Sequence, residues 1–372
     1  MTKFQKMSYS FFFILPKYKK MFKRKTFLKF SLIKLTEIII PMLSFIIHII
    51  GGKNMIDIQY LLILQKFREI TGGVFDGIFE GLSVVAADVL YFLPFVIYWA
   101  VDKAWGKRFI TTMFGAELVN ALLKLTFCVY RPWIRSDLIQ PAGNAKLTAT
   151  GYSFPSGHTN RATSVLGTLT VWQSKKRRWL AILAAVGIAL VAFSRNYLGV
   201  HTPQDVLVSC TVGFAVIFLI GKILNAAEGN EKLKDKLTIP GIILVVLAII
   251  YVKFKPYPMD YVDGKLLVDP NKMVNDSFKV FGSVTAFLVG FWIDRHYIHY
   301  TIPVGHKNLP VLTAVGSGII FSWKLYFAGP IIVTLLGKQI GNFTANFIGT
   351  FFAIVIFPII ITKFTKDESQ SA

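Results

Sequence analysis

Long apolar segments recur along almost the whole chain and constrain its fold more than any other feature. Most are about 20 residues long, the length that an α-helix needs to cross the hydrocarbon core of a bilayer. Only 16% of the residues are charged and 54% are hydrophobic, whereas soluble domains contain about 25% charged residues. We therefore expect an all-α fold, a polytopic transmembrane helical bundle with about nine spans plus one optional N-terminal span. The segments lie near residues 36–50, 80–100, 108–128, 159–173, 178–197, 203–224, 238–253, 278–294, 309–335 and 340–362.

The same composition argues against intrinsic disorder, a disulfide scaffold and a secreted domain. The two cysteines, Cys128 and Cys210, both lie within apolar segments, where a cysteine behaves as a small buried hydrophobic residue. We expect both to be free thiols.

A net charge of +21 could indicate a nucleic-acid-binding protein, but the placement of the charges argues against it. Residues 1–35 contain ten Lys and Arg residues and no acidic residue, and most other basic residues lie in short connections between apolar segments. Basic residues in such places orient a protein in the membrane and contact anionic headgroups. The expected partners are membrane lipids and no nucleic acid, and the sequence does not indicate an oligomeric state.

Cytoplasmic connections carry an excess of Lys and Arg, which predicts the side that each connection faces. The most basic connection is Lys175–Arg178, so we expect it to be cytoplasmic. Alternation of the spans then places the other basic connections on the same side, at 101–108, 225–237, 295–308 and the C-terminal tail. The outward connections are expected at 129–158, 195–203 and 254–277, the last being either a lid over an outward site or a solvated connection.

The N-terminal part precedes the regular spans. Residues 1–55 are expected to form a basic tail with a candidate signal-anchor helix, since no small-residue cleavage site is evident. Residues 56–79 are expected to form an interfacial amphipathic helix, because apolar and charged positions alternate at helical spacing over 56–72.

Three segments at outward helix ends carry residues suited to chemistry. In the first, Lys124 and Arg131 are seven residues apart, about two helical turns, so they share one face. Glu117 and Asn120 lie on roughly the same stripe, and Pro132 ends the helix. Charged groups on one face of a span are costly in lipid, so we expect them to face the bundle interior. Snorkelling toward the interface would explain Arg131 alone, but not the deeper Lys124.

The second segment is Phe154-Pro155-Ser156-Gly157-His158, which opens a predicted helix. The first backbone N–H groups of a helix point outward and form an anion-binding site. Ser156 adds a hydroxyl donor. A histidine at a helix N-terminus is more often a surface residue, so this segment indicates a functional site only in combination with the other two.

The third segment runs from Ser194-Arg195 to His201 and Asp205. A spacing of four places His201 and Asp205 on one helix face, where the carboxylate can accept the imidazole N–H and select its tautomer. An oriented, basic imidazole is what a nucleophilic histidine requires; a purely structural histidine–aspartate pair is the alternative. Together, the three segments supply three cations around one pocket, which is typical of a site for a multiply charged anion.

The three segments have the form K-x6-RP, PSGH and SR-x5-H-x3-D, and with them the sequence resembles the type 2 phosphatidic acid phosphatase / vanadium haloperoxidase superfamily. All eleven specified residues are present in the family's order and spacing, and the resemblance covers roughly residues 80–224. It implies that Lys124, Arg131 and Arg195 bind the phosphoryl oxygens, with help from Ser156 and Gly157.

The resemblance also implies the catalytic roles. His201 would attack phosphorus to give a phosphohistidine intermediate, Asp205 would orient it, and His158 would protonate the leaving alkoxide before water hydrolyses the intermediate. No metal or other cofactor is implied, because the cations do the electrostatic work that Mg²⁺ does elsewhere. Residues 80–224 are thus expected to be the phosphatase core, and residues 225–372 to add C-terminal helices that compact members of the family lack. In topology the chain is also similar to the glucose-6-phosphatase branch.

The expected function is a membrane phosphatase for a lipid phosphomonoester or diphosphate, such as phosphatidic acid or a polyprenyl diphosphate, acting at the extracytoplasmic face. Two alternatives keep the pocket: a phosphotransferase or small sugar-phosphate phosphatase, and a non-catalytic binding or transport protein. The latter is disfavoured because pure binding needs neither a nucleophile nor an acid. The Lys-, Phe- and Ile-rich, Cys-poor composition favours a bacterial cell membrane; in a eukaryotic cell the outward face would be lumenal.

Overall fold

The computed structural model describes residues 56–366, so the expected basic tail and signal-anchor helix in residues 1–55 lie outside the described residues. The described residues all belong to one compact unit. Its described part is almost entirely helical, and the single small sheet there pairs the two-residue strands β1 (Tyr261–Val262) and β2 (Lys265–Leu266) as a hairpin. The predicted all-α class is therefore confirmed. Both cysteines are free thiols, as expected.

Eight helical segments of the described chain are long and apolar enough to cross a membrane. Several contain short π-helical stretches, and each such segment is treated below as one span. The spans are α4–η3–α5–η4 (Asp76–Val84, Val85–Val89, Leu90–Val96, Ile97–Val101), α6–α7 (Lys103–Phe127, Pro132–Arg135), α10 (Arg178–Tyr197), α11 (Pro203–Ala226), α12 (Glu231–Phe254), α13–η5 (Pro270–Ile293, Asp294–Ile298), α14–η6–α15 (Leu309–Ser322, Trp323–Val333, Thr334–Leu336) and α16–η7–α17 (Lys338–Phe351, Phe352–Ile356, Phe357–Lys366).

The ninth expected span, at 159–173, differs from the others. It is the helix α9 (Gly157–Gln173), which has 17 residues and a polar composition. Its buried residues include Asn160, Thr163, Ser164 and Thr168. Because α9 packs against α6, α10 and α11, these polar positions face other helices instead of lipid, so the helix does not need the apolar surface of an ordinary span.

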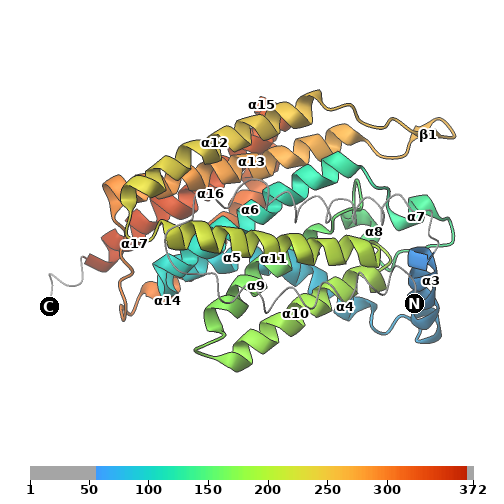
Figure 1. Ribbon diagram of the computed structural model, residues 1–372, viewed down its shortest axis with the longest axis horizontal. Coiled ribbons are helices and arrows are strands. Elements are labelled where there is room, and N and C mark those ends of the chain that lie inside the picture. Colours follow the sequence, from blue (N-terminus) through green and yellow to red (C-terminus); the bar gives the residue numbers. More distant parts are fainter. Residues whose placement is uncertain (1–55, 367–372) are drawn as a thin grey trace, which may run out of the picture. The chain divides into compact units, whose positions relative to one another are not determined.

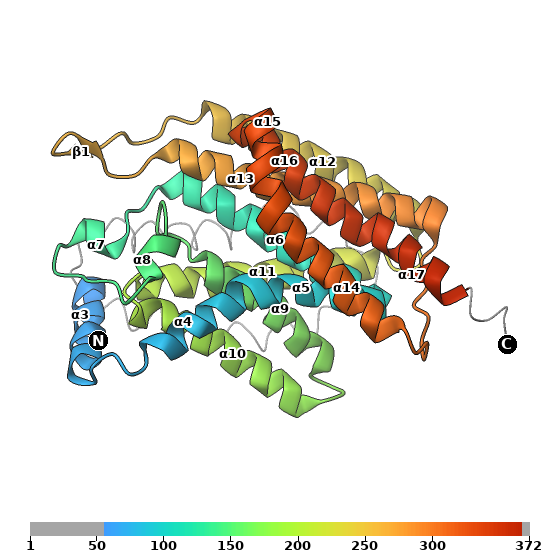
Figure 2. The same ribbon diagram turned by 180° about the vertical axis from the view of Figure 1, so that it is seen from behind.

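The helices alternate in direction, and their connections gather at two ends of the bundle (Figure 1 and Figure 2). One end holds α7, α8 (Ala145–Thr148) and the β1–β2 hairpin, and it is also where the three sequence motifs lie. The other end holds the α9–α10 connection, the start of α14 and the end of α17. The basic connections thus share one end, as the alternation of spans requires.

The connection expected at 254–277 is shorter than that. α12 ends at Phe254 and α13 begins at Pro270, because Asp269 caps the helix by accepting a hydrogen bond from the amide of Asn271 at 2.9 Å, and Pro270 takes the first helical position. Tyr261 and Val262 of the hairpin are exposed. The lid and the solvated connection both remain predictions.

The helix α3 (Ile56–Ile70) lies across the motif-bearing end of the bundle, with its axis transverse to the spans (Figure 1). Its buried Ile58 and Leu61 pack with Ile139 of the α7–α8 connection, and Asp57 forms a 2.7 Å ion pair with Arg135. The chain then turns through Gly72 and Gly73, both at positive φ, into α4. The amphipathic helix of the sequence therefore ends at Ile70, and its place at a membrane interface stays a prediction.

α13 connects the motif-bearing helices to the C-terminal ones. It packs against α6 on one side and against α12 and α16 on the other, and all of these contribute to one apolar core. The contact with α16 is a close backbone approach, since a Cβ atom added at Gly282 would lie 2.1 Å from the carbonyl oxygen of Phe343.

Candidate active site

The first motif lies where α6 ends. Cys128 adopts a left-handed conformation with φ of 49° and terminates the helix, so Arg131 stands in the extended segment that follows. Lys124 is still on α6 and is 8% exposed. Its ammonium donates to the carbonyl oxygens of Tyr152, Ser153 and Pro155 at 3.0, 3.2 and 2.9 Å. These bonds use all three donors of the ammonium, so in this conformation Lys124 holds the 152–155 segment against α6.

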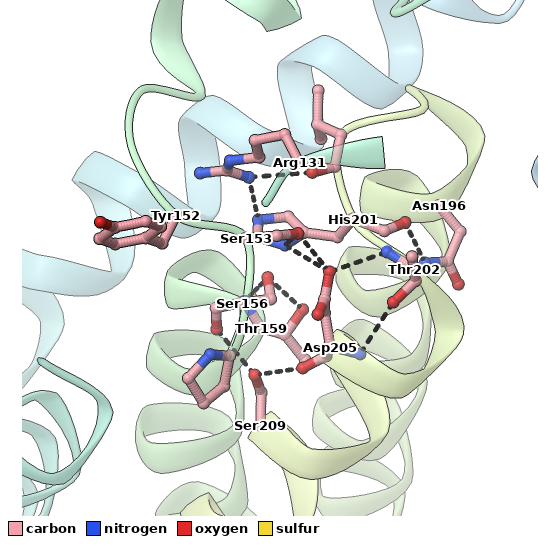
Figure 3. Close-up of polar contacts among 12 residues, drawn as sticks. Arg131, Tyr152, Ser153, Ser156, Thr159, Asn196, His201, Thr202, Asp205 and Ser209 are labelled. Carbon is pink, nitrogen blue, oxygen red and sulfur yellow. Dashed lines mark hydrogen bonds and ion pairs between the residues drawn. The ribbon is translucent and has the colours of Figure 1, made fainter. Parts of the chain in front are cut away.

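Arg131 is almost fully buried and binds two segments of the motif-bearing end at once. Its guanidinium donates to the carbonyl oxygens of Thr150 and Gly151 at 3.2 and 3.1 Å. Its Nη1 donates to the carbonyl oxygen of Val200 at 2.9 Å and lies 2.9 Å from Nε2 of His201. Figure 3 shows the guanidinium directly beside the imidazole.

The third motif is shaped by the end of α10. Gly199 has a φ of +70°, a conformation that costs residues with a Cβ atom and is readily adopted by glycine. The amides of Val200 and His201 both donate to the carbonyl oxygen of Arg195 at 3.2 Å. This compact turn, after which Pro203 opens α11, directs the His201 side chain back toward the bundle.

His201 and Asp205 are both 2% exposed and form the centre of the site (Figure 3). Oδ2 of Asp205 lies 3.3 Å from Nδ1 of His201, and it also accepts hydrogen bonds from the hydroxyl of Ser153 at 2.5 Å and from the amide of Thr202 at 2.9 Å. Because Arg131 can only donate, Nε2 of His201 is the acceptor in their contact and the ring proton is on Nδ1. This tautomer places the lone pair of the ring, and not its proton, on Nε2.

The charge state of His201 follows from its surroundings. Burial lowers its pKa well below the usual imidazole value, and the cations Arg131, Arg195 and Lys124 lower the pKa further. The imidazole is therefore neutral at neutral pH. Of the three cations expected around the pocket, Arg131 contacts the ring directly at 2.9 Å.

The second motif forms the start of α9. Ser156 is its N-cap, and its hydroxyl accepts hydrogen bonds from the amide and the hydroxyl of Thr159 at 3.4 and 3.1 Å. The amide of Ser156 donates to the carbonyl oxygen of Asp205 at 3.2 Å, which ties α9 to α11. The amides of Gly157 and His158 are the next two of the helix, and helix geometry gives such amides no carbonyl partner within the helix.

Arg195 is 1% exposed. Its Nη1 donates to the hydroxyl of Ser83 at 2.6 Å. Its Nε and Nη2 are buried and have no hydrogen-bond partner within residues 56–366. A buried guanidinium with unused donors is costly to leave unpaired, and it provides a bidentate binding surface for a phosphoryl group.

A cavity of about 250 Å³ opens beside these groups, between α6, α9 and α13. Of the expected site residues, Lys124, Gly157 and His158 line it, whereas Arg131, Arg195, His201 and Asp205 lie outside its lining. The structure therefore brings the eight expected residues to the same end of the bundle, in two adjoining parts.

Sequence reasoning missed two hydroxyl groups, those of Ser153 and Ser83. Ser153 precedes the PSGH motif by two residues, and Ser83 lies in the first span; neither is marked by spacing relative to the motif residues. Within the described residues, no group of three or more His, Cys, Asp and Glu side chains is arranged to hold a metal ion. The arrangement instead offers cations and backbone N–H groups to an anion, and a neutral imidazole to attack it.

Comparison with known proteins identifies a family. The sequence model of the PAP2 superfamily matches residues 105–228, which contain all three motifs. The chain is 28% identical to an undecaprenyl-diphosphatase of Sulfolobus acidocaldarius over 181 residues, 48% of this chain and 84% of the relative.

Two further relatives share different extents of the chain. A phosphatidylglycerophosphatase B of Bacillus subtilis is 31% identical over 126 residues, 32% of this chain and 58% of the relative. A sphingosine-1-phosphate phosphatase 2 of Mus musculus is 21% identical over 293 residues, 75% of this chain and 76% of the relative. No solved structure matches the chain.

Proposed function

Because this chain belongs to the PAP2 superfamily of phosphoric ester hydrolases, we propose that it removes phosphate from a lipid phosphate in the membrane through a phosphohistidine intermediate. The lipid phosphate class is also that of the relatives, which are named as phosphatases of undecaprenyl diphosphate, phosphatidylglycerophosphate and sphingosine 1-phosphate. The observation that carries the proposal is the neutral, oriented His201 next to the unused donors of Arg195.

In the first step, Nε2 of His201 attacks phosphorus and the ester P–O bond breaks. Arg131 now occupies this lone pair, so its guanidinium must move onto the phosphoryl oxygens when substrate binds. The positive charge that develops on the ring is stabilised by Asp205 through the Nδ1–H bond. Arg195 and the free amides at the start of α9 bind the other phosphoryl oxygens.

The leaving alkoxide takes its proton from the imidazolium form of His158, which lines the adjoining cavity. In the second step a water molecule gives that proton back to His158 and attacks phosphorus, and the N–P bond breaks. Phosphate leaves, and His201 returns to its neutral form. Both steps balance with water as the sole co-reactant.

The active site opens at the end of the bundle opposite the basic connections. If the basic connections are cytoplasmic, this end faces the outside of the cell or the lumen of an organelle. We propose that lipid phosphates of that leaflet are the substrates.

The test is phosphate release by the purified full chain in detergent micelles with EDTA present. The panel holds phosphatidic acid, sphingosine 1-phosphate, undecaprenyl diphosphate and glucose 6-phosphate. We expect release from lipids that is lost in His201→Ala and kept in the matched variant His296→Ala, whose histidine lies at the other end of the bundle. Release that survives in His201→Ala would refute the mechanism, and release from glucose 6-phosphate alone would refute the substrate class.

The phosphohistidine itself can be detected separately. Brief incubation with a ³²P-labelled lipid phosphate followed by rapid denaturation should leave acid-labile, alkali-stable label on the wild-type chain. The same label on the His201→Ala variant would show that another residue is the nucleophile.

A further inference from the structure

The cavity between α6, α9 and α13 lies on one side of the phosphoryl site. It touches His158 and Gly157 but none of Arg131, Arg195 and His201. Under the proposed function, His158 protonates the leaving oxygen, so the cavity is where the leaving group of the substrate lies.

Two buried side-chain amides line this cavity without a partner. Asn120 on α6 is 5% exposed and Asn160 on α9 is 1% exposed. Nδ2 of Asn120 and both polar atoms of Asn160 have no hydrogen-bond partner among residues 56–366. A buried polar group left unpaired costs about 1–3 kcal/mol, so two such groups at one cavity indicate a bound group that pairs with them.

The charged residues of the cavity, in contrast, have partners. Arg161 forms a 2.5 Å ion pair with Glu117, and Asp276 on α13 pairs with Lys279 at 2.7 Å. The ammonium of Lys124 donates to three carbonyl oxygens. The Lys and Arg side chains of the lining are thus already engaged within the described residues, and the cavity is better matched to an uncharged or cationic leaving group than to a second phosphate.

The third wall comes from outside the region that matches the family. Met273, Ser277 and Val280 of α13 close the cavity opposite α9, whereas the matched region ends at residue 228. α13 therefore adds a surface that residues 105–228 lack, with a hydroxyl between two apolar side chains.

We propose that this cavity recognises the leaving group of a lipid phosphomonoester that carries a hydroxyl or amino group close to the phosphoester oxygen, with Asn120 and Asn160 as its hydrogen-bonding partners and α13 as its outer wall. This inference rests on the proposed function and assigns its substrate class. It predicts a higher kcat/KM for such monoesters than for plain alkyl phosphates or lipid diphosphates.

The experiment compares kcat/KM for four probes in mixed micelles. Sphingosine 1-phosphate carries an amine and a hydroxyl on the two carbons that follow the phosphate-bearing carbon, and lysophosphatidic acid carries a hydroxyl. Hexadecyl phosphate carries neither group. Farnesyl diphosphate tests the diphosphate class. One or two hydrogen bonds from uncharged amides correspond to a preference of about tenfold. We expect the wild type to prefer the first two probes to the last two by that factor, and the first two probes distinguish an amine from a hydroxyl as the recognised group.

The variants are Asn120→Leu and Asn160→Leu, which keep the branched heavy-atom skeleton of asparagine and remove its hydrogen-bonding groups. We expect each to lower the preference toward unity by slowing the first two probes more than hexadecyl phosphate, and to keep or raise the midpoint temperature of unfolding, because an unpaired buried amide is removed. The matched control is Asn346→Leu on α16, which is expected to leave the preference unchanged because its amide is bonded to the carbonyl oxygen of Asn342 outside the cavity.

Four results would overturn the inference while leaving the proposed function standing. Two concern the wild type: a preference for farnesyl diphosphate, or equal hydrolysis of all four probes. Two concern the variants: a preference that survives in both leucine variants, or a loss of midpoint temperature accompanied by equal losses on all four probes. Release from none of them would overturn the proposed function and the inference with it.

Discussion

Replacing Asp205 by asparagine tests whether the carboxylate acts through the charge of His201. In the structure Oδ2 of Asp205 accepts from Ser153, from the amide of Thr202 and from Nδ1 of His201. An asparagine oxygen at the same place can keep the bonds from Thr202 and Ser153, so the start of α11 should stay folded. What is lost is the negative charge beside a ring that becomes positive in the transition state.

The size of the loss follows from the contact. Opposite unit charges about 4 Å apart interact by roughly 4 kcal/mol at an effective dielectric constant of about 20. The hydrogen bond itself weakens, because bonds to charged groups are worth about 1.5–3 kcal/mol and neutral ones about 1 kcal/mol. A loss of about 3–4 kcal/mol in transition-state stabilisation corresponds to a fall in kcat of roughly 10²–10³-fold.

The assay is steady-state phosphate release from the preferred lipid phosphate in micelles, with thermal unfolding as a check on folding. We expect kcat to fall while KM changes little, because the phosphoryl group is bound by the arginines and the α9 amides. A fall of less than tenfold, or a rise in KM with kcat unchanged, would refute the argument that Asp205 stabilises the imidazolium.

Three further predictions concern binding, pH and packing. Ser83→Ala should raise KM and weaken vanadate inhibition by about tenfold, because Arg195 loses a hydrogen bond of the kind worth about 1.5–3 kcal/mol; unchanged inhibition would contradict its role in holding the guanidinium. Burial and nearby cations lower the pKa of His201, so the ring stays neutral to lower pH than a free imidazole. The acid limb of kcat/KM should therefore lie below pH 6.5 once the titration of the substrate is subtracted. A limb above that value would count against His201 as the neutral nucleophile. Gly282→Val should lower the midpoint temperature of unfolding, since its Cβ would lie 2.1 Å from the carbonyl oxygen of Phe343; an unchanged midpoint would mean that α13 and α16 can separate freely.

The local features of this protein were accessible from the sequence, because they depend on residues close together in the chain. The apolar segments predicted a helical membrane bundle, and the described part of the chain contains eight helices of suitable length and composition. The turn at Gly199 and the capping box of Thr202 and Asp205 are likewise short-range, and they place His201 and Asp205 in contact, as their spacing of four residues predicted.

Other features could not be read from the sequence, because they depend on helices far apart in the chain. Asn160 lies in a motif helix, but only the packing of α9 against α6 and α11 shows that its amide is buried and unpaired. The hydroxyl of Ser83 accepts a hydrogen bond from Arg195, which lies 112 residues away in the sequence. The ammonium of Lys124 donates to carbonyl oxygens that no spacing rule predicts.

The sequence by itself thus determined the class of the fold and the resemblance to a family, and it indicated which residues are candidate reactive groups, since helix periodicity and motif spacing are local. Only the tertiary structure decided which neighbours those groups meet. It brought α13, from outside the family region, to the edge of the site, because burying that helix against α6 and α16 places one of its faces at the cavity. The leaving-group preference that we propose depends on that packing.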